Sequence, residues 1–312
     1  MARHRLLQIS AITPAVDARL AADYDVAALW KEADPKAFLA AHGSEFEVAA
    51  IHLRFPFGDE LMAALPKLKA IANFGVGYDK IDVDAARRRG IQVSNTPKVL
   101  DECVADLAFG LMIDVARGVS AATRFVRAGA WKTGQRPLMT RVNRKRLGLL
   151  GYGGIGQAIA RRADAFLMDV RYHTRHVVPG APHQHVDSLV ELARWADFLV
   201  VACVGGPQTF HLVSAEVIDA LGPEGILVNI ARGSIVDEKA LVEALVAGRL
   251  GGAGLDVFEH EPDVPQPLLE MDNVVAVAHI GGFTRESRRD MEASVCDNVD
   301  AYFRTGKLLT PV

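Results

Sequence analysis

Three residues in the second half of the chain are of types that perform acid/base chemistry on a small anion: Arg232, Glu261 and His279. The ordinary pKa of histidine lies near neutral pH, so His279 can give a proton to a carbonyl oxygen or take one from a hydroxyl. Glu261 can orient the imidazole and favour its charged form, and Arg232 can bind a carboxylate with its planar guanidinium. They predict a site that binds a 2-oxo acid and protonates its carbonyl, with Arg232 and His279 contacting the substrate.

Each of these residues has a simpler explanation when considered alone. Arg232 can cap a helix end, Glu261 can be a turn residue before Pro262, and His279 can be an ordinary loop histidine. Their shared placement favours chemistry, because they follow the carboxyl ends of three predicted strands, at 226–230, 254–257 and 274–278. Ligands of open α/β sheets bind beyond such ends, so the three side chains are expected to converge.

A glycine-rich turn, Gly151-Tyr-Gly-Gly-Ile-Gly156, follows a predicted strand at 147–150 and opens a predicted helix at 155–166. That context favours a dinucleotide site over an ordinary turn, because the glycines permit a tight turn, close approach of a pyrophosphate and close packing of helix on strand. The N–H groups of the first helical turn then face the anion. The predicted contacts of this turn are Gly151, Gly153, Gly154, Ile155 and Gly156.

The end of the next predicted strand, 170–173, distinguishes between the two nicotinamide cofactors. An acidic residue there would accept a hydrogen bond from the ribose hydroxyl of NAD. This chain instead has Thr174, Arg175 and His176, which can donate hydrogen bonds to the 2′-phosphate of NADP. The sequence therefore predicts NADP in preference to NAD, although a basic solvated loop would show the same residues.

Composition excludes several classes of function. The net charge of −3 gives no electrostatic basis for binding nucleic acid or an anionic membrane surface. Cys103, Cys203 and Cys296 form no CxxC pair, and His183 and His185 lack suitably spaced partners, so neither a metal site nor a disulfide framework is expected. Because no apolar run approaches about 20 residues and the amino terminus does not resemble a signal peptide, a cytoplasmic location is expected.

The length of 312 residues suggests two domains, and alternating apolar and amphipathic segments predict an α/β fold with parallel sheets. In the first part, strands are predicted at 6–9, 48–53 and 70–74. One long helix is predicted from 101 to about 128. Six strands then suit a doubly wound Rossmann-like sheet, and a helix at about 285–303 is expected to return to the first domain.

The sequence thus predicts two Rossmann-like domains, of which the substrate-binding one is discontinuous and flavodoxin-like. That domain is expected to comprise residues 1–98 and 283–312. Residues 99–282 are expected to form the dinucleotide-binding domain.

Over essentially its whole length the chain resembles the D-isomer-specific 2-hydroxyacid dehydrogenase family. The segments that carry the resemblance are 73–82, 102–108, 149–156, 228–233, 252–258 and 261–262. Within the family it is most similar to the glyoxylate/hydroxypyruvate reductases, including the plant hydroxyphenylpyruvate reductase branch. Two segments depart from the pattern: the 204–209 loop reads Val-Gly-Gly-Pro-Gln-Thr, and the connector after Trp131 lacks a second tryptophan.

The resemblance implies that Arg232, Glu261 and His279 are the catalytic set and that backbone groups of Val76 and Gly77 bind the substrate carboxylate. It also implies a homodimer joined through the cofactor domains, in which Trp131 either lies near the partner's site or packs in the dimer. Further cofactor contacts are implied on the nicotinamide and adenosine sides, namely Val104, Cys203, Val204, Thr209, Ile230, Ala231, Arg232, Asp256, His279 and Gly281.

The expected activity is NADPH-dependent reduction of a small 2-oxo acid, such as glyoxylate or hydroxypyruvate, to the D-2-hydroxy acid. Two alternatives stay open. The substrate can be a bulkier 2-oxo acid such as hydroxyphenylpyruvate, or the chain can be a nucleotide-sensing binding protein without catalysis, because one fold supports several functions.

Overall fold

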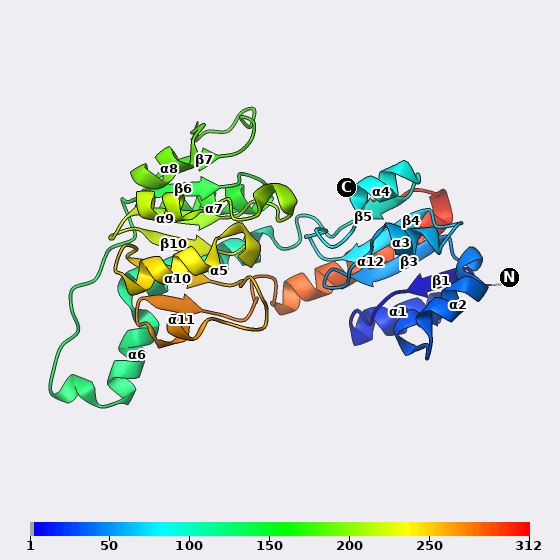
Figure 1. Cartoon of the computed structure of the whole chain (residues 1–312), viewed down its shortest axis with the longest axis horizontal. Coiled ribbons are helices and arrows are strands. Elements are labelled where there is room, and N and C mark those ends of the chain that lie inside the picture. The colour runs from blue at the N-terminus through cyan, green and yellow to red at the C-terminus, as the bar shows by residue number, and fades with distance from the viewer. Residues whose placement is uncertain (1–2) are drawn as a thin grey trace. The chain divides into compact units, whose positions relative to one another are not determined.

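The computed structural model describes residues 3–312. The chain divides into two compact units: Met1–Val99 with Arg285–Val312, here called unit 1, and Leu100–Thr284, here called unit 2. Figure 1 shows that each unit contains a sheet with helices packed against it. Unit 1 is discontinuous, because helix α12 (Arg285–Thr305) packs against its strands and against α1 (Pro14–Asp23). The predicted two-domain α/β fold is confirmed.

Unit 1 contains a five-stranded parallel sheet in the order β2-β1-β3-β4-β5. This is the flavodoxin-like order, in which the direction of winding reverses between β1 and β3. The strands are β1 (Arg5–Gln8), β2 (Asp25–Ala28), β3 (Val48–His52), β4 (Ala70–Phe74) and β5 (Gln92–Ser94), and the remaining helices are α2 (Pro35–His42), α3 (Asp59–Ala63) and α4 (Val83–Arg88).

The two edge strands, β2 and β5, are absent from the sequence prediction. Both are short, and β2 has no fully buried residue. Edge strands need no continuous apolar run, so the pattern that revealed the central strands does not mark them.

Unit 2 contains a seven-stranded parallel sheet in the order β12-β11-β10-β9-β6-β7-β8. The order reverses between β6 and β9, as in Rossmann folds. The strands are β6 (Arg146–Leu150), β7 (Asp169–His173), β8 (Gln184–His185), β9 (Phe198–Val201), β10 (Ile226–Asn229), β11 (Gly252–Leu255) and β12 (Val274–Ala276). The sequence predicted six of them and missed β8, which is only two residues long.

The helices of unit 2 cover a sheet whose buried residues are mostly apolar, such as Leu147, Leu149, Val200 and Val228. They are α5 (Asp101–Arg117), α6 (Val119–Arg127), α7 (Gly154–Ala165), α8 (Leu189–Trp195), α9 (Ala215–Leu221), α10 (Glu238–Val246) and α11 (Gln266–Glu270). In residues 3–312, no helix combines the length and apolar character needed to cross a membrane.

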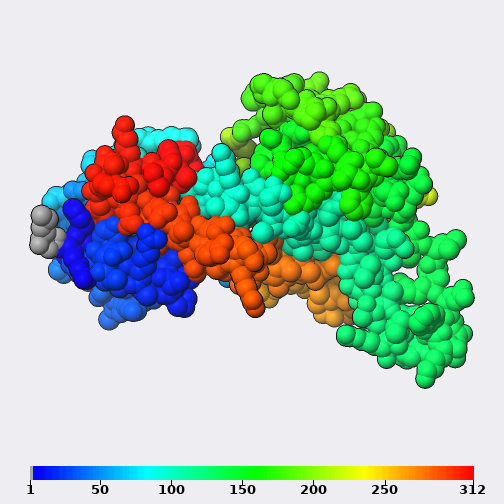
Figure 2. Space-filling view, turned by 180° about the vertical axis from the view of Figure 1, so that it is seen from behind, coloured from blue at the N-terminus to red at the C-terminus, as the bar shows by residue number. Residues whose placement is uncertain are grey.

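The single long helix predicted from 101 to 128 is wrong, because the chain forms α5 and α6 with Gly118 between them. Gly118 adopts a left-handed conformation with φ +60°, which ends α5. The Asp114 carboxylate then accepts a hydrogen bond of 2.7 Å from the N–H of Ser120 in the first turn of α6. The helical spacing of apolar residues continues across Gly118, so the sequence pattern could not reveal the break between α5 and α6. In the space-filling view, α6 and the following connector stand out from the surface of unit 2 (Figure 2).

Candidate active site

The turn between β6 and α7 has the backbone geometry that the glycine motif predicts. Gly151 has φ +101°, and a Cβ atom there would lie 2.6 Å from the N atom of Cys203. A Cβ at Gly156 would collide with the carbonyl oxygen of Gly151, and one at Gly154 would collide with the Asp101 carboxylate. Gly151 and Gly156 therefore require glycine, because the atoms in the way belong to the backbone, whereas a side chain at Gly154 would have to displace the Asp101 carboxylate.

Gly153 differs from the other glycines of the turn, because an added Cβ would meet nothing within 4 Å in the described chain. It is the N-cap residue of α7 and, as a glycine, supplies no side-chain cap, while the Asp101 carboxylate lies close to the next residue, Gly154. The first N–H groups of a helix attract anions when no side chain occupies them. The arrangement, with Ile155 in the first turn, fits the pyrophosphate of a dinucleotide.

Beyond the carboxyl end of β7 the chain presents hydrogen-bond donors. The hydroxyl of Thr174 donates to the carbonyl oxygen of His176 at 2.7 Å, and Nη1 of Arg175 donates to Oε1 of Gln208 at 2.7 Å. Nε2 of His185 donates to the carbonyl oxygen of Thr174 at 2.9 Å and so holds the end of the strand. Arg175 and His176 are both exposed. These groups suit a phosphate better than a ribose hydroxyl that needs an acceptor.

Glu261 and His279 are in direct contact beyond the carboxyl ends of β11 and β12, which lie at the other end of the strand order from β7. Nδ1 of His279 lies 2.8 Å from Oε2 of Glu261, and Oε1 of Glu261 accepts a hydrogen bond of 3.2 Å from the N–H of Phe258. Because a carboxylate only accepts, the proton of the shared hydrogen bond belongs to Nδ1. Nε2 is then the imidazole atom left to act on a substrate.

The local charges keep Glu261 ionised. Burial alone would raise the pKa of Glu261, but the hydrogen bond and charge of His279, the Phe258 N–H and the charge of Arg232 together hold that pKa below its usual value. Arg232 therefore lies near enough to act on this carboxylate.

The loop after β12 is fixed by the buried side chain of Asp256. Its carboxylate accepts hydrogen bonds from the N–H groups of Ile280 (2.6 Å) and Gly281 (2.9 Å), and its carbonyl oxygen accepts one from the N–H of His279 (2.9 Å). Burial raises the pKa of Asp256, and the two N–H donors oppose that effect only in part. His279 adopts φ +54°, an uncommon conformation for a residue other than glycine, and these bonds hold it there.

Arg232 is placed by the loop that follows β10. The side chain of the buried Asn229 accepts a hydrogen bond from the N–H of Ala231 (3.1 Å) and donates one to the carbonyl oxygen of Arg232 (2.9 Å). A Cβ at Gly205 would lie 2.5 Å from Cγ of Arg232, so the loop after β9 packs on the arginine stem. Arg232, Glu261 and His279 follow the adjacent strands β10, β11 and β12.

The remaining cofactor candidates of unit 2 lie along the same edge of the sheet. A Cβ at Gly281 would lie 3.0 Å from the Asp256 carboxylate and 3.3 Å from the side chain of Val104, so these three residues cluster. Ile230 is buried beside Ala231. Burial raises the pKa of Cys203 to about 11, so its thiol stays neutral. Thr209 donates to the carbonyl oxygen of Val204 at 2.9 Å.

In unit 1, the loop that contains Val76 and Gly77 is held by two asparagines. The side-chain amide of the buried Asn73 donates to the carbonyl oxygens of Gly75 (3.2 Å) and Gly77 (2.9 Å). The side-chain amide of Asn95 donates to the carbonyl oxygen of Val76 (2.8 Å). Within residues 3–312, the N–H groups of Val76 and Gly77 donate to no other group. They are available for an anion.

Sequence reasoning missed both asparagines as site residues. Asn73 stands in a segment used only for the family resemblance, and its contacts with Gly75 and Gly77 depend on the turn that the loop makes. Asn95 lies far from that loop in sequence, so no local signal marks it.

His183 and His185 serve the structure around β8. His183 lies between the hydroxyl of Tyr152 (2.6 Å) and the carboxylate of Asp164 (3.0 Å). Across the described residues, no three His, Cys, Asp or Glu side chains come together as a metal site.

This geometry is that of a dinucleotide-binding turn and a hydrogen-bonded histidine–glutamate pair, and comparisons with known proteins identify the class. Residues 109–281 match the family model of the D-isomer specific 2-hydroxyacid dehydrogenase NAD binding domain. The chain belongs to this family of oxidoreductases, as the sequence motifs predicted.

The most informative relatives are reductases of 2-oxo acids. The chain is 46% identical to a hydroxyphenylpyruvate reductase of Plectranthus scutellarioides, over 91% of this chain and 90% of that protein. It is 42% identical to a glyoxylate/hydroxypyruvate reductase of Arabidopsis thaliana, over 93% and 92% of the two chains. The NADPH-dependent glyoxylate/hydroxypyruvate reductase of Sinorhizobium meliloti, solved with NADP and malonate, superposes with a TM-score of 0.92 at 42% identity, covering 100% of this chain and 97% of that one.

Proposed function

We propose that the protein uses NADPH to reduce a small 2-oxo acid, glyoxylate or hydroxypyruvate, to the D-2-hydroxy acid. The observation that carries this proposal is the hydrogen bond between Nδ1 of His279 and the ionised Glu261, a carboxylate that follows the strand next to the one Arg232 follows. Unit 2 takes the role of dinucleotide-binding domain in this proposal, and unit 1 that of substrate-binding domain.

The nicotinamide supplies the hydride when the cofactor is bound. The guanidinium of Arg232 and the N–H groups of Val76 and Gly77 bind the substrate carboxylate. Nε2 of His279 gives its proton to the carbonyl oxygen during reduction and takes it back during oxidation. Glu261 keeps the proton on Nδ1, stabilises the imidazolium and fixes the ring.

The preference for NADPH over NADH rests on the donors beyond β7. Arg175, Thr174 and His176 supply a cation and polar groups, whereas Asp169 stands at the other end of that strand. The solved relative from Sinorhizobium meliloti is NADPH-dependent, which supports the same preference here.

Steady-state kinetics with NADPH and NADH on glyoxylate, hydroxypyruvate, pyruvate and 4-hydroxyphenylpyruvate tests the proposal. Highest kcat/KM with NADPH and one of the first two acids is expected. Highest kcat/KM with 4-hydroxyphenylpyruvate would favour the second candidate, which the similarity to the Plectranthus reductase supports. Cofactor binding without turnover of any 2-oxo acid would indicate a nucleotide-sensing protein.

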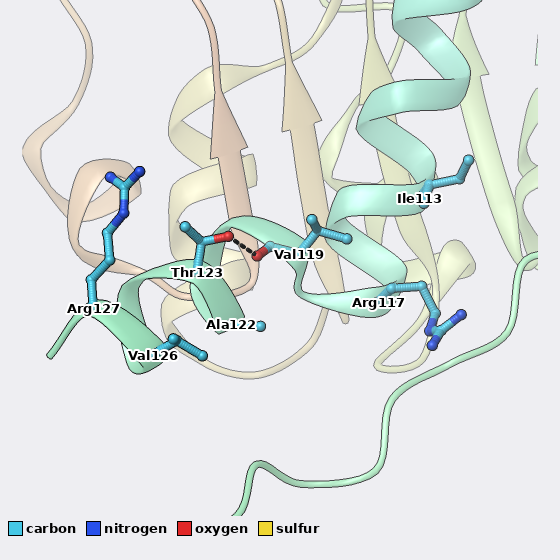
Figure 3. Close-up of a pocket in the computed structure, with 7 residues that line it drawn as sticks. All are labelled: Ile113, Arg117, Val119, Ala122, Thr123, Val126 and Arg127. Atoms are coloured by element: carbon cyan, nitrogen blue, oxygen red, sulfur yellow. Dashed lines mark hydrogen bonds between the residues drawn. The ribbon is translucent and has the colours of Figure 1, made fainter. Parts of the chain in front are cut away.

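The homodimer expected from the family is a further part of the proposal. An open groove lies between the end of α5 and α6 (Figure 3), and its lining residues are Ile113, Arg117, Val119, Ala122, Thr123, Val126 and Arg127. Val119 and Val126 are about half exposed, and Trp131 and Leu138 on the connector are more exposed still. Exposed apolar side chains gathered in one region suit burial against a second copy of the chain.

Two finer expectations complete the proposal. A contribution of Trp131 to the partner's site is tested by the substrate KM of a Trp131→Ala variant that remains dimeric. Cytoplasmic location is tested by cell fractionation.

A further inference from the structure

Arg175 is joined to a second loop through Gln208. The side chain of Gln208 comes from the short helix η4 (Pro207–Thr209), on the loop that follows β9, and its Oε1 accepts the 2.7 Å hydrogen bond from Nη1 of Arg175. In the sheet, β7 and β9 are the two neighbours of β6, the strand that leads into the glycine turn. The Arg175–Gln208 contact therefore joins loops that start on either side of the dinucleotide turn.

The contact fixes which way the Gln208 amide points. Arginine has only donors, so the amide oxygen must face Arg175. The two N–H groups on Nε2 of Gln208 have no acceptor within residues 3–312, and the side chain is exposed. Gln208 can consequently hold the guanidinium and offer donors of its own at the same time.

The loop that carries Gln208 is held in place. The hydroxyl of Thr209 lies 2.9 Å from the carbonyl oxygen of Val204 and 3.2 Å from that of Gly206, and Gly205 packs against the stem of Arg232. On the other side, His185 holds the carbonyl of Thr174. A pair of donors on two fixed loops loses little freedom when it binds a ligand.

We propose that Gln208 is a second determinant of cofactor choice, which holds Arg175 beside the adenosine 2′-phosphate of NADPH and donates an amide hydrogen bond to that phosphate. This inference rests on the proposed preference for NADPH. A phosphate has several acceptor oxygens, so it can take hydrogen bonds from the guanidinium and the amide together. The ribose hydroxyl of NADH carries no such charge, so the amide would contribute little to NADH binding.

The test compares the KM values for NADPH and NADH in the wild type and in Gln208→Ala, Gln208→Glu and Arg175→Ala. In Gln208→Ala, KM for NADPH is expected to rise about fivefold to tenfold, with less than about a twofold rise for NADH, because a hydrogen bond to a charged group is lost. Gln208→Glu should raise KM for NADPH further, since its carboxylate can still pair with Arg175 but repels the phosphate. Gln266→Ala, at an exposed glutamine of α11, is the matched control and should match the wild type.

The double variant Arg175→Ala/Gln208→Ala separates the two roles of Gln208. A further rise in KM for NADPH over Arg175→Ala supports direct donation to the phosphate, and no further rise overturns it. Two results would overturn the role of Gln208 and leave the proposed function standing. In the first, Arg175→Ala loses the preference for NADPH over NADH but Gln208→Ala keeps it. In the second, Gln208→Ala raises the KM values for NADPH and NADH equally. A wild type that uses NADH as well as NADPH would overturn the proposed cofactor preference itself, and this inference with it.

Discussion

His279 and Glu261 are joined by a 2.8 Å hydrogen bond although they follow different strands, β12 and β11. The contact depends on the parallel pairing of these strands, which brings their carboxyl ends to one edge of the sheet. A second set of bonds, from Asp256 to the backbone of residues 279–281, holds the imidazole in register with the carboxylate. The contact between His279 and Glu261 is thus a product of sheet topology as much as of residue type.

Replacing His279 by alanine should reduce kcat for glyoxylate reduction by a factor of about 10² or more, because positioned acid/base catalysis contributes at least that much. The cofactor KM should change far less than kcat. Stopped-flow and steady-state measurements with NADPH check this. Near-normal turnover would show that another group transfers the proton.

The stability contributed by Glu261 should depend on pH in a defined direction. Its folded-state pKa is lowered, so its stabilising effect is complete above the ordinary glutamate pKa of about 4.3 and is lost as pH falls through the lower folded value. The wild type should therefore melt at a higher temperature than Glu261→Gln at pH 7. The two melting temperatures should converge in acid, and a difference that grows as pH falls would contradict the assignment.

Two glycines of the same turn should respond differently to an added methyl group. Gly151→Ala forces a side chain into φ +101° and against Cys203, so a loss of stability of about 1–3 kcal/mol is expected. The methyl group of Gly153→Ala would point into open space, so this variant should melt at the same temperature as the wild type. It should bind NADPH more weakly, because the methyl group would occupy the space proposed for the pyrophosphate. Calorimetry and cofactor titration of the pair check this, and similar affinity in Gly153→Ala and the wild type would argue against a pyrophosphate at this turn.

Asn73→Ala removes two hydrogen bonds that hold the loop with Val76 and Gly77. KM for the 2-oxo acid should rise about tenfold, with little change in KM for NADPH, because the loop is proposed to bind only the substrate carboxylate. Thermal melting of the variant controls for a general loss of structure. Equal effects on both KM values would indicate that the loop has no specific substrate role.

Val126→Asp should convert the proposed dimer to a monomer, because it places a charge at a half-exposed apolar position of the groove that the dimer would bury. Val246→Asp, at an exposed valine of α10, is the control and should remain dimeric. Light scattering after size-exclusion chromatography measures both. A wild type that is already monomeric would refute the proposed assembly.

Most central features of the fold could be predicted from sequence because their signals are local. The glycines from 151 to 156 mark their turn by residue type, and buried strands such as β6 and β10 are continuous apolar runs. The short strands β2, β5 and β8 carry no comparable run, and the break at Gly118 falls within an uninterrupted helical period.

The candidate site shows the same division between local and distant signals. Arg232, Glu261 and His279 could be proposed because each directly follows a recognisable strand. Gln208 and Asn95 could not, because their partners, Arg175 and Val76, lie in other loops and meet them only after the sheets have formed.

Helix α12 has a consequence for the order in which the protein is made. Unit 2 is one uninterrupted stretch and can fold as soon as it leaves the ribosome, whereas the earlier strands of unit 1 must wait for a helix translated after all of unit 2. Until α12 has been translated, it cannot cover the surface of β4 against which it packs in the folded protein. We therefore expect unit 2 to complete its fold before unit 1 does during synthesis.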